Sequence, residues 1–469
     1  MSMRKIILTI SSLLIIGLSA CEDFLDKAPQ DQISKEEALN DIFSVELALN
    51  GAYNLLGQGA YYGEFFPLYA DLAGGNLKLA SDITAANEEN YRPVYAFSLQ
   101  PELSSPATRA YQEMYEVLNA VNNIINAVPT LTDGTEARQN TVLGQALALR
   151  ALVHFDLSRL YAQPYNFSDD ALHPGVVLLE SSPSVENELG RASVDEVYQQ
   201  IVTDLERAIT LLPAFSNPYR ISAEAAKALL ARVYLYAGEW SRAASLSGEV
   251  INSGLIGLAS TSEYPQIWQN GYRAAEHIFR LDMSAPVQNL IAGVVGVGAP
   301  QPALAVSQDL RELYTETDVR GPGTMMQEDV NGDWLSAKYP FSFNRPSDVA
   351  IVRLSEVYLI RAEALARLGR PELALADLNV IRERADPTLE FETLQGEALL
   401  QAILQERRKE LAVEGHWLFD LSRSGRDVIR EDCPAEVNCN LSYPDPRFVL
   451  PIPQNALDAN RNLEQNPGY

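Results

Sequence analysis

Two segments of this 469-residue chain share one spacing of glycine and alanine, and that spacing restricts what the chain can fold into. Each segment has a glycine followed five residues later by an alanine: Gly238 and Ala243 within residues 223–253, and Gly369 and Ala374 within residues 352–385. Apolar residues at helical spacing surround both glycines, which predicts two helices joined by a tight turn, with the alanine at their crossing. Such short pairs cannot bury their own apolar faces, so we expect them to stack.

The helical period recurs elsewhere in the chain, so the predicted fold class is mainly α. Further helices are expected at residues 35–55, 107–128, 141–161, 195–212 and 397–414. The first is expected to have Ser34 as its N-cap and Glu37 as the capping-box partner. The paired helices resemble tetratricopeptide repeats, which implies a helical-repeat scaffold.

Long stretches without a helical period separate these helices and give the expected domain organisation. The predicted parts are a signal peptide at 1–20, a lipidated tether at 21–33 and a single domain at 34–469, with the scaffold at about 34–56, 107–256 and 347–420, irregular binding loops at about 57–106 and 257–346, and a tail at 421–469. Residues 163–193 also lack a helical period. Loops this long are uncommon in compact domains unless they carry function, so we expect the ligand to bind there.

The first 21 residues predict a lipoprotein signal. Arg4 and Lys5 precede an apolar run at residues 6–16, which is too short to span a bilayer. Leu18-Ser19-Ala20-Cys21 resembles the lipobox of bacterial lipoproteins, which implies acylation of Cys21 and contact with the membrane through the lipid alone. The following Glu22-Asp23 resembles a surface-export signal, and an acidic tether without an addressing role remains the alternative.

The charge of the chain argues against polyanionic partners. The 36 basic and 62 acidic residues give a formal net charge of −26, and loss of Arg4 and Lys5 with the signal makes it −28. Nucleic acid is therefore excluded as an expected partner, and a neutral or cationic ligand is favoured. Besides Cys21, the chain has Cys433 and Cys439, which we expect to form a disulfide in an oxidising envelope compartment.

Neither a catalytic motif nor a metal-ligand spacing stands out in the sequence. His154 lies among apolar residues and is expected in the core. The run from Asp329 to Asp333 begins like a calcium loop, but Trp334 and Pro340 occupy the positions of the required glycine and carboxylate, so a solvated turn is favoured. We expect a protein that is not an enzyme and has no cofactor or metal.

One charged helix looks like a site but has a simpler interpretation. Arg407, Arg408 and Glu410 lie beside Leu404 and Leu411, and we expect them to form ion pairs between helices.

Several longer motifs occur in the order seen in one known family. They are Arg150-Ala-Leu-Val-His-Phe-Asp-Leu157 with Pro164-Tyr165, Arg353–Ala364, Ala374–Arg384, Glu406-Arg-Arg with Glu414-Gly415, Phe419-Asp-Leu421, Leu450-Pro-Ile-Pro453 and Gln465-Asn-Pro-Gly-Tyr469. They make the chain similar to the SusD/RagB family of outer-membrane nutrient-binding lipoproteins. The resemblance implies an α-helical, tetratricopeptide-like half and a loop-rich half. It also implies capture of an oligosaccharide at the cell surface and a role as lid of a SusC-like TonB-dependent transporter.

The resemblance also points to the region of the ligand site. Family members commonly bind glycans with the first loop and the late loop, which here contain Asn87, Tyr91, Tyr95 and Trp334. Aromatic rings and amide groups suit the apolar face and the hydroxyls of a sugar. Packing of Tyr91 and Tyr95 on the scaffold is the alternative for those two rings. For the whole chain, an oligopeptide-binding RagB-like protein and a structural helical-repeat adaptor remain open.

Overall fold

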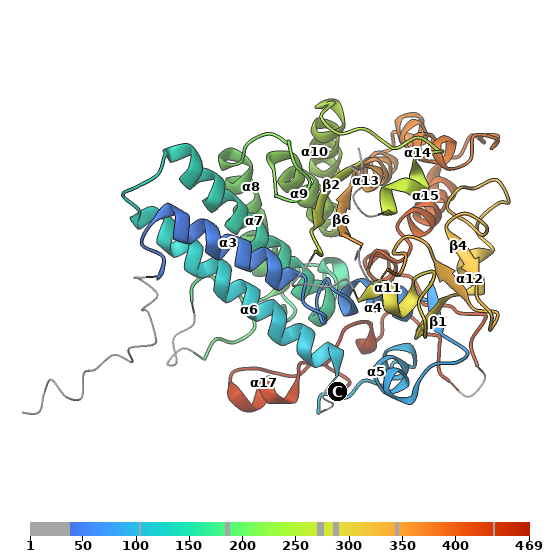
Figure 1. The fold of residues 1–469 in the computed structure, drawn as a ribbon, viewed down its shortest axis with the longest axis horizontal. Coiled ribbons are helices and arrows are strands. Elements are labelled where there is room, and N and C mark those ends of the chain that lie inside the picture. The colour runs from blue at the N-terminus through green and yellow to red at the C-terminus, as the bar shows by residue number, and fades with distance from the viewer. Residues whose placement is uncertain are drawn as a thin grey trace, which may run out of the picture.

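Helices dominate the fold, and the strands form three small antiparallel pairs (Figure 1). The computed structural model describes residues 38–102, 105–182, 188–269, 276–284, 290–342, 347–434 and 437–469. The helices are α3 (Ile42–Leu56), α4 (Phe65–Gly74), α5 (Ala85–Tyr95), α6 (Pro106–Ala127), α7 (Glu136–Tyr161), α8 (Val194–Leu211), α9 (Ala223–Ala237), α10 (Trp240–Asn252), α11 (Ile291–Val295), α12 (Gln308–Arg311), α13 (Leu354–Arg367), α14 (Pro371–Ala385), α15 (Gly396–Glu410), α16 (Trp417–Arg423) and α17 (Gln454–Ala459). The strand pairs are β1 (Leu77–Leu79) with β3 (Leu304–Val306), β2 (His277–Leu281) with β6 (Val349–Arg353), and β4 (Met326–Glu328) with β5 (Trp334–Ser336).

The long helices form a stacked scaffold. Along the chain α3 packs on α6, α6 on α7, α7 on α8, α8 on α9 and α9 on α10, and α10 then packs on α13. α13 in turn contacts α14 and α15. Gly238 and Gly369 lie between the paired helices with φ of 77° and 70°, a backbone conformation that favours glycine. The two predicted turns are therefore confirmed.

The helix expected at residues 35–55 is interrupted in its described part, because residues 39–41 form a turn. α3 begins at Ile42, and the side chain of Asp41 accepts the Ser44 N–H at 2.7 Å as its N-cap. The predicted cap, Ser34, lies outside the described residues.

The prediction of irregular loops at 57–106 was wrong in part, because α4 and α5 lie there. All ten residues of α4 are buried, so its sequence has no polar face and shows no amphipathic period. α5 contains Pro93 and three charged residues, which hide its helical period. Residues 257–342 match the expectation better, since their described part contains only short strands and short helical turns.

One large hydrophobic core runs through both halves of the molecule. A smaller cluster fills the space between α13, α14 and α15. None of the helices in the described ranges combines the length and apolar character that a bilayer crossing requires.

Candidate functional site

The two regions expected to bind the ligand meet at a buried carboxylate and at a strand pair. The carboxylate of Asp333 accepts the backbone N–H of Ser81 at 2.6 Å and the Ser81 hydroxyl at 2.7 Å. Ser81 follows β1 and precedes α5, whereas Asp333 directly precedes β5. β1 also pairs with β3, and β3 packs against β5. The regions at residues 57–106 and 257–346 are thus fixed against each other.

A pocket of about 470 Å³ lies at this junction. Its walls come from the segment between β1 and α5, the Gly298–Pro302 turn and the β4–β5 hairpin. The polar lining residues are Asp82, Gln301, Glu328, Asp329, Asn331 and Asp333. None of the lining residues is a lysine or arginine, and Pro300 and Pro302 supply apolar surface. The pocket therefore offers many hydrogen-bond acceptors and would repel an anionic ligand.

The run from Asp329 to Asp333 forms the tight turn of the β4–β5 hairpin. The carboxylate of Asp329 accepts the N–H groups of Asn331 and Asp333 at 2.8 and 2.9 Å. Gly332 has a φ of 83°, which favours glycine. The favoured interpretation of this segment as a turn is confirmed, since the Asp329 carboxylate accepts backbone N–H groups of the hairpin turn. Within the described ranges, no group of three His, Cys, Asp or Glu side chains is placed to hold a metal ion.

Trp334 begins β5 and is half-buried; its neighbours Asp333 and Leu335 line the pocket, but Trp334 itself does not. The guanidinium of Arg311, at the end of α12, lies over its indole with Cζ 4.9 Å from the ring centroid. Arg311 Nε is buried and has no hydrogen-bond partner among the described residues. Arg311 is thus a candidate ligand-binding residue that the sequence analysis missed, because nothing in the sequence places α12 over β5.

Asn87, Tyr91 and Tyr95 all lie on α5, but they differ in exposure. Asn87 is partly exposed in the first turn, where its N–H bonds to the N-cap Thr84 at 3.2 Å. Tyr91 and Tyr95 are each only 2% exposed. A buried ring cannot stack on a ligand that arrives from solvent, so the expected open platform is wrong for these two residues, and their role here is packing.

The partners of the two tyrosines explain their burial. The Tyr91 hydroxyl donates to Glu64 at 2.5 Å, and burial raises the pKa of Tyr91 well above its ordinary value. The ring of Tyr95 lies beneath the Arg430 guanidinium, with Cζ 4.6 Å from its centroid. Burial lowers the pKa of Arg430 to about 10.

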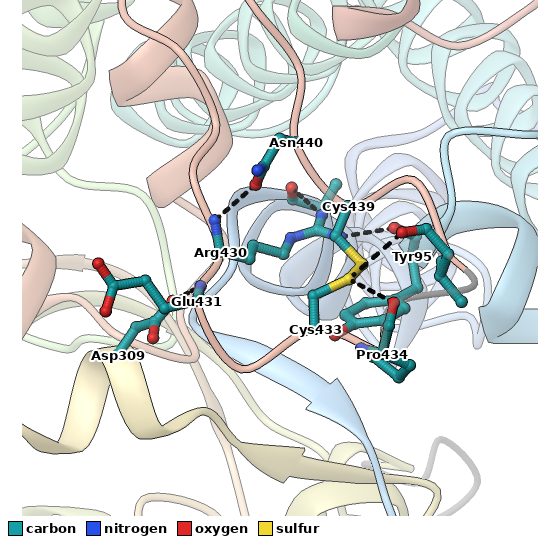
Figure 2. The surroundings of a disulfide bond; sticks show 10 residues. Tyr95, Asp309, Arg430, Glu431, Cys433, Pro434, Cys439 and Asn440 are labelled. Carbon is teal, nitrogen blue, oxygen red and sulfur yellow. Dashed lines mark hydrogen bonds between the residues drawn. A yellow bond between two sulfur atoms is a disulfide. The ribbon is translucent and has the colours of Figure 1, made fainter.

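The expected disulfide between Cys433 and Cys439 is present, close to Arg430 and Tyr95 (Figure 2). Just before this loop, Arg430 donates to the Tyr95 carbonyl at 2.5 Å. The Glu431 N–H donates to Asp309 at 3.0 Å, so the same segment holds α12. The segment next to the disulfide therefore connects the end of α5 to the helix that carries Arg311.

A cluster of buried charges around Glu410 is paired and serves the fold. Glu410 accepts from Arg320, Arg353 and Arg384 at 3.0, 2.9 and 2.7 Å, and all four side chains are buried. Although burial opposes it, the arginines hold the pKa of Glu410 well below its ordinary value. The predicted ion pairs are confirmed for Glu410 and for Arg407, which pairs with Asp420 at 3.2 Å, whereas Arg408 donates to the Asn76 side-chain oxygen at 2.7 Å.

His154 is a core residue, as expected. It is fully buried, and its Nε2 accepts the Leu179 N–H at 3.1 Å. Burial lowers the pKa of His154 to about 3, so the imidazole is neutral. Cys21 and the tether lie outside the described residues.

Known proteins with similar sequences indicate the family to which this chain belongs. Residues 336–469 match the family model described as "SusD family", and residues 23–235 match the one described as "Starch-binding associating with outer membrane". "SusD-like protein P38" of Formosa agariphila is 25% identical over 99% of each chain. "Starch-binding protein SusD" of Bacteroides thetaiotaomicron is 32% identical over 26% of this chain and 22% of that protein.

The fold matches as well. A crystal structure of a SusD superfamily protein from Bacteroides thetaiotaomicron superposes with a TM-score of 0.83 at 28% identity, covering 91% of this chain and 100% of the other. The matched sequence segments cover most of the chain, and its helical scaffold is that of the solved relative. The chain therefore belongs to the SusD-like family.

Proposed function

We propose that this protein binds a neutral oligosaccharide in the pocket at the Ser81–Asp333 junction and does not act on it chemically. The observation that carries this proposal is the junction itself, which joins the two expected loop regions around a pocket rich in hydrogen-bond acceptors. Sugar hydroxyls donate hydrogen bonds to carboxylate and amide oxygens, and proline rings can pack against sugar C–H groups. Asn87 and the Arg311–Trp334 pair are proposed to contribute at its edge.

The relatives support a glycan as the ligand. One matched family model is described as starch-binding, and one relative is named a starch-binding protein. The lack of lysine and arginine in the pocket lining favours uncharged sugars over uronic acids or sulfated sugars.

The cellular role completes the proposal. Acylation of Cys21 would anchor the chain to the outer membrane, in line with the outer-membrane wording of the matched model. Anchored there, the protein would act as the lid of a SusC-like TonB-dependent transporter and present the captured glycan to it.

The test is calorimetric titration of the soluble chain from Glu22 onward. The panel holds malto-oligosaccharides, laminari-oligosaccharides, uronic-acid oligomers and tripeptides. The proposal expects saturable binding of at least one neutral glycan and none of the uronic-acid oligomers. Binding of tripeptides without binding of any glycan would replace the proposal with peptide capture, and no binding at all would favour a structural adaptor.

A further inference from the structure

A second pocket lies far along the chain from the Ser81–Asp333 junction. It has a volume of about 290 Å³ and lies between the segment that follows α7 and the two segments that flank α17. Its lining includes Gln163, Phe167, His173, Arg191, Asp445 and Asn466, together with four prolines. Two motifs with no assigned role in the proposed function border it, Pro164-Tyr165 and Gln465-Asn466-Pro467.

One side of this pocket is aromatic and fixed in place. The ring of Phe167 is 44% exposed and meets the His173 imidazole edge-on, with centroids 5.3 Å apart. The imidazole is held at both nitrogens, because Nδ1 lies 2.8 Å from the Ser168 hydroxyl and Nε2 lies 3.2 Å from the Gln163 carbonyl oxygen. The phenyl face is therefore presented to solvent by a rigid support.

The other side carries a guanidinium that has no carboxylate partner in the described part of the chain. Arg191 donates instead to four backbone carbonyls: Gly175 at 2.7 Å, Tyr161 at 3.1 Å, Pro174 at 3.2 Å and Glu464 at 3.2 Å. Burial lowers the pKa of Arg191, yet the group stays charged at neutral pH. The hydrogen bonds to carbonyls fix the position of the Arg191 guanidinium, but no ion pair compensates its charge.

Amide groups complete the polar side. The Gln163 side-chain oxygen is buried without a hydrogen-bond partner among the described residues. Asn466 donates to the carbonyls of Tyr161 and Leu450 at 2.9 and 2.7 Å, which ties the C-terminal segment to the pocket wall. A ligand hydroxyl that donated to Gln163 would remove the cost of an unpaired buried acceptor.

These features distinguish between ligand classes. An apolar side chain from a peptide would pack on Phe167 but leave Gln163 unpaired, and an anion would meet a guanidinium that already donates to four carbonyls. A pyranose ring offers an apolar C–H face and hydroxyls that both donate and accept. We propose that this pocket is a second sugar-binding site, which holds one neutral pyranose residue.

The inference rests on the proposed function only in taking a glycan as the ligand. Its consequence is bivalent binding, in which a long glycan chain occupies both pockets or two chains are held at once. Occupation of two sites by one polymer raises the apparent affinity without any new contact type.

Histidine NMR can test this site separately from the first pocket. Of the four histidines, His154, His277 and His416 are buried, and His173 alone lines the pocket. In the mature chain labelled at histidine Cε1, maltotriose or laminaritriose should shift the His173 signal saturably. The same shift should persist in Trp334→Ala. Phe167→Ala should weaken the response at least tenfold.

A matched control is Leu172→Ala, because Leu172 is 64% exposed on the same segment and does not line the pocket. It should leave the His173 response unchanged. Dissociation constants above about 50 mM for both sugars would overturn the proposal, because such binding is too weak to capture a ligand. So would an equal response in Phe167→Ala, or a His173 shift caused by triproline and not by sugars.

The tryptophan indole signals, recorded in the same titration, report on the first pocket. If they respond to glycan and His173 does not, the second site is refuted and the proposed function stands. If His173 alone responds, the second site stands and the first is misplaced.

Discussion

The carboxylate of Asp333 accepts two hydrogen bonds from Ser81, a residue 252 positions earlier in the chain. Asp333 is 4% exposed and has no cationic partner among the described residues, so it depends on these donors. Together with the β1–β3 strand pair and the packing of β3 on β5, this contact fixes the hairpin that carries Trp334 against the segment that leads into α5.

Asp333→Ala should lower the free energy of unfolding by about 2 kcal/mol, because it leaves the Ser81 N–H unpaired and removes bonds to a charged acceptor. Urea denaturation measures the loss. The neighbouring Asp82 is exposed, and Asp82→Ala should leave the unfolding midpoint unchanged. Equal midpoints for the two variants would show that the junction does not hold the loops together.

Arg311→Gln should weaken glycan binding about tenfold, because it removes the guanidinium over Trp334 and its free donors. Calorimetric titration with the best glycan measures the change. Arg367 lies over Trp240 in a similar way, 5.5 Å from the ring centroid and away from the pocket. Arg367→Gln should therefore bind like the wild type, and a matching loss there would refute the local role of Arg311.

Glu410→Gln should destabilise the fold by about 3–5 kcal/mol, since three buried arginines would lose a shared negative partner. Thermal and urea unfolding measure the effect. Glu46 forms an exposed pair with Arg138, and Glu46→Gln should give no measurable change. A small effect at Glu410 would mean that solvent or other carboxylates readily compensate the arginines.

Stability should fall as the pH drops from 7 to 5. Burial lowers the pKa values of His154, His277 and His416. In this pH range the unfolded chain therefore binds protons at these residues and the folded chain does not. Asp71 acts in the opposite direction, because burial raises its pKa to about 6 and the folded state takes up a proton there. Burial also raises the pKa values of Glu64 and Glu113, but the ordinary pKa of a glutamate lies below this range. All three histidines take up protons across the range in the unfolded chain, so the net slope favours unfolding at lower pH.

Below about pH 4.5 the loss should steepen. The buried ion pairs hold the pKa values of Glu406 and Glu410 below their ordinary range, so stability present above that range disappears as they are protonated. Urea midpoints measured from pH 8 to pH 3 test both regions. A midpoint that stays constant between pH 7 and pH 5 would contradict the assignment of neutral buried histidines.

The sequence allowed prediction of features that depend on local spacing. The turns at Gly238 and Gly369 follow from glycine at a helix end, and both have the expected backbone conformation. The core position of His154 follows from its apolar neighbours, and the turn at Asp329 follows from its Asp, Asn and Gly content.

Features that depend on distant partners could not be predicted. Tyr91 is buried by a contact with Glu64, 27 residues away, and Tyr95 by Arg430, which bonds to it across 335 residues. Arg311 meets Trp334 only because β3 leads into α12 beside β5. α4 was missed because a helix buried on every side has no amphipathic pattern.

The most direct test of the account compares two tryptophan variants in titrations with the glycan that binds best. Trp334 lies beside the proposed site, whereas Trp240 is equally half-buried under an arginine but lies in the helical scaffold. If the glycan binds at the Ser81–Asp333 junction, Trp334→Ala should weaken binding at least tenfold and Trp240→Ala should leave it unchanged. Equal affinities for the two variants would contradict the placement of the glycan at the Ser81–Asp333 junction.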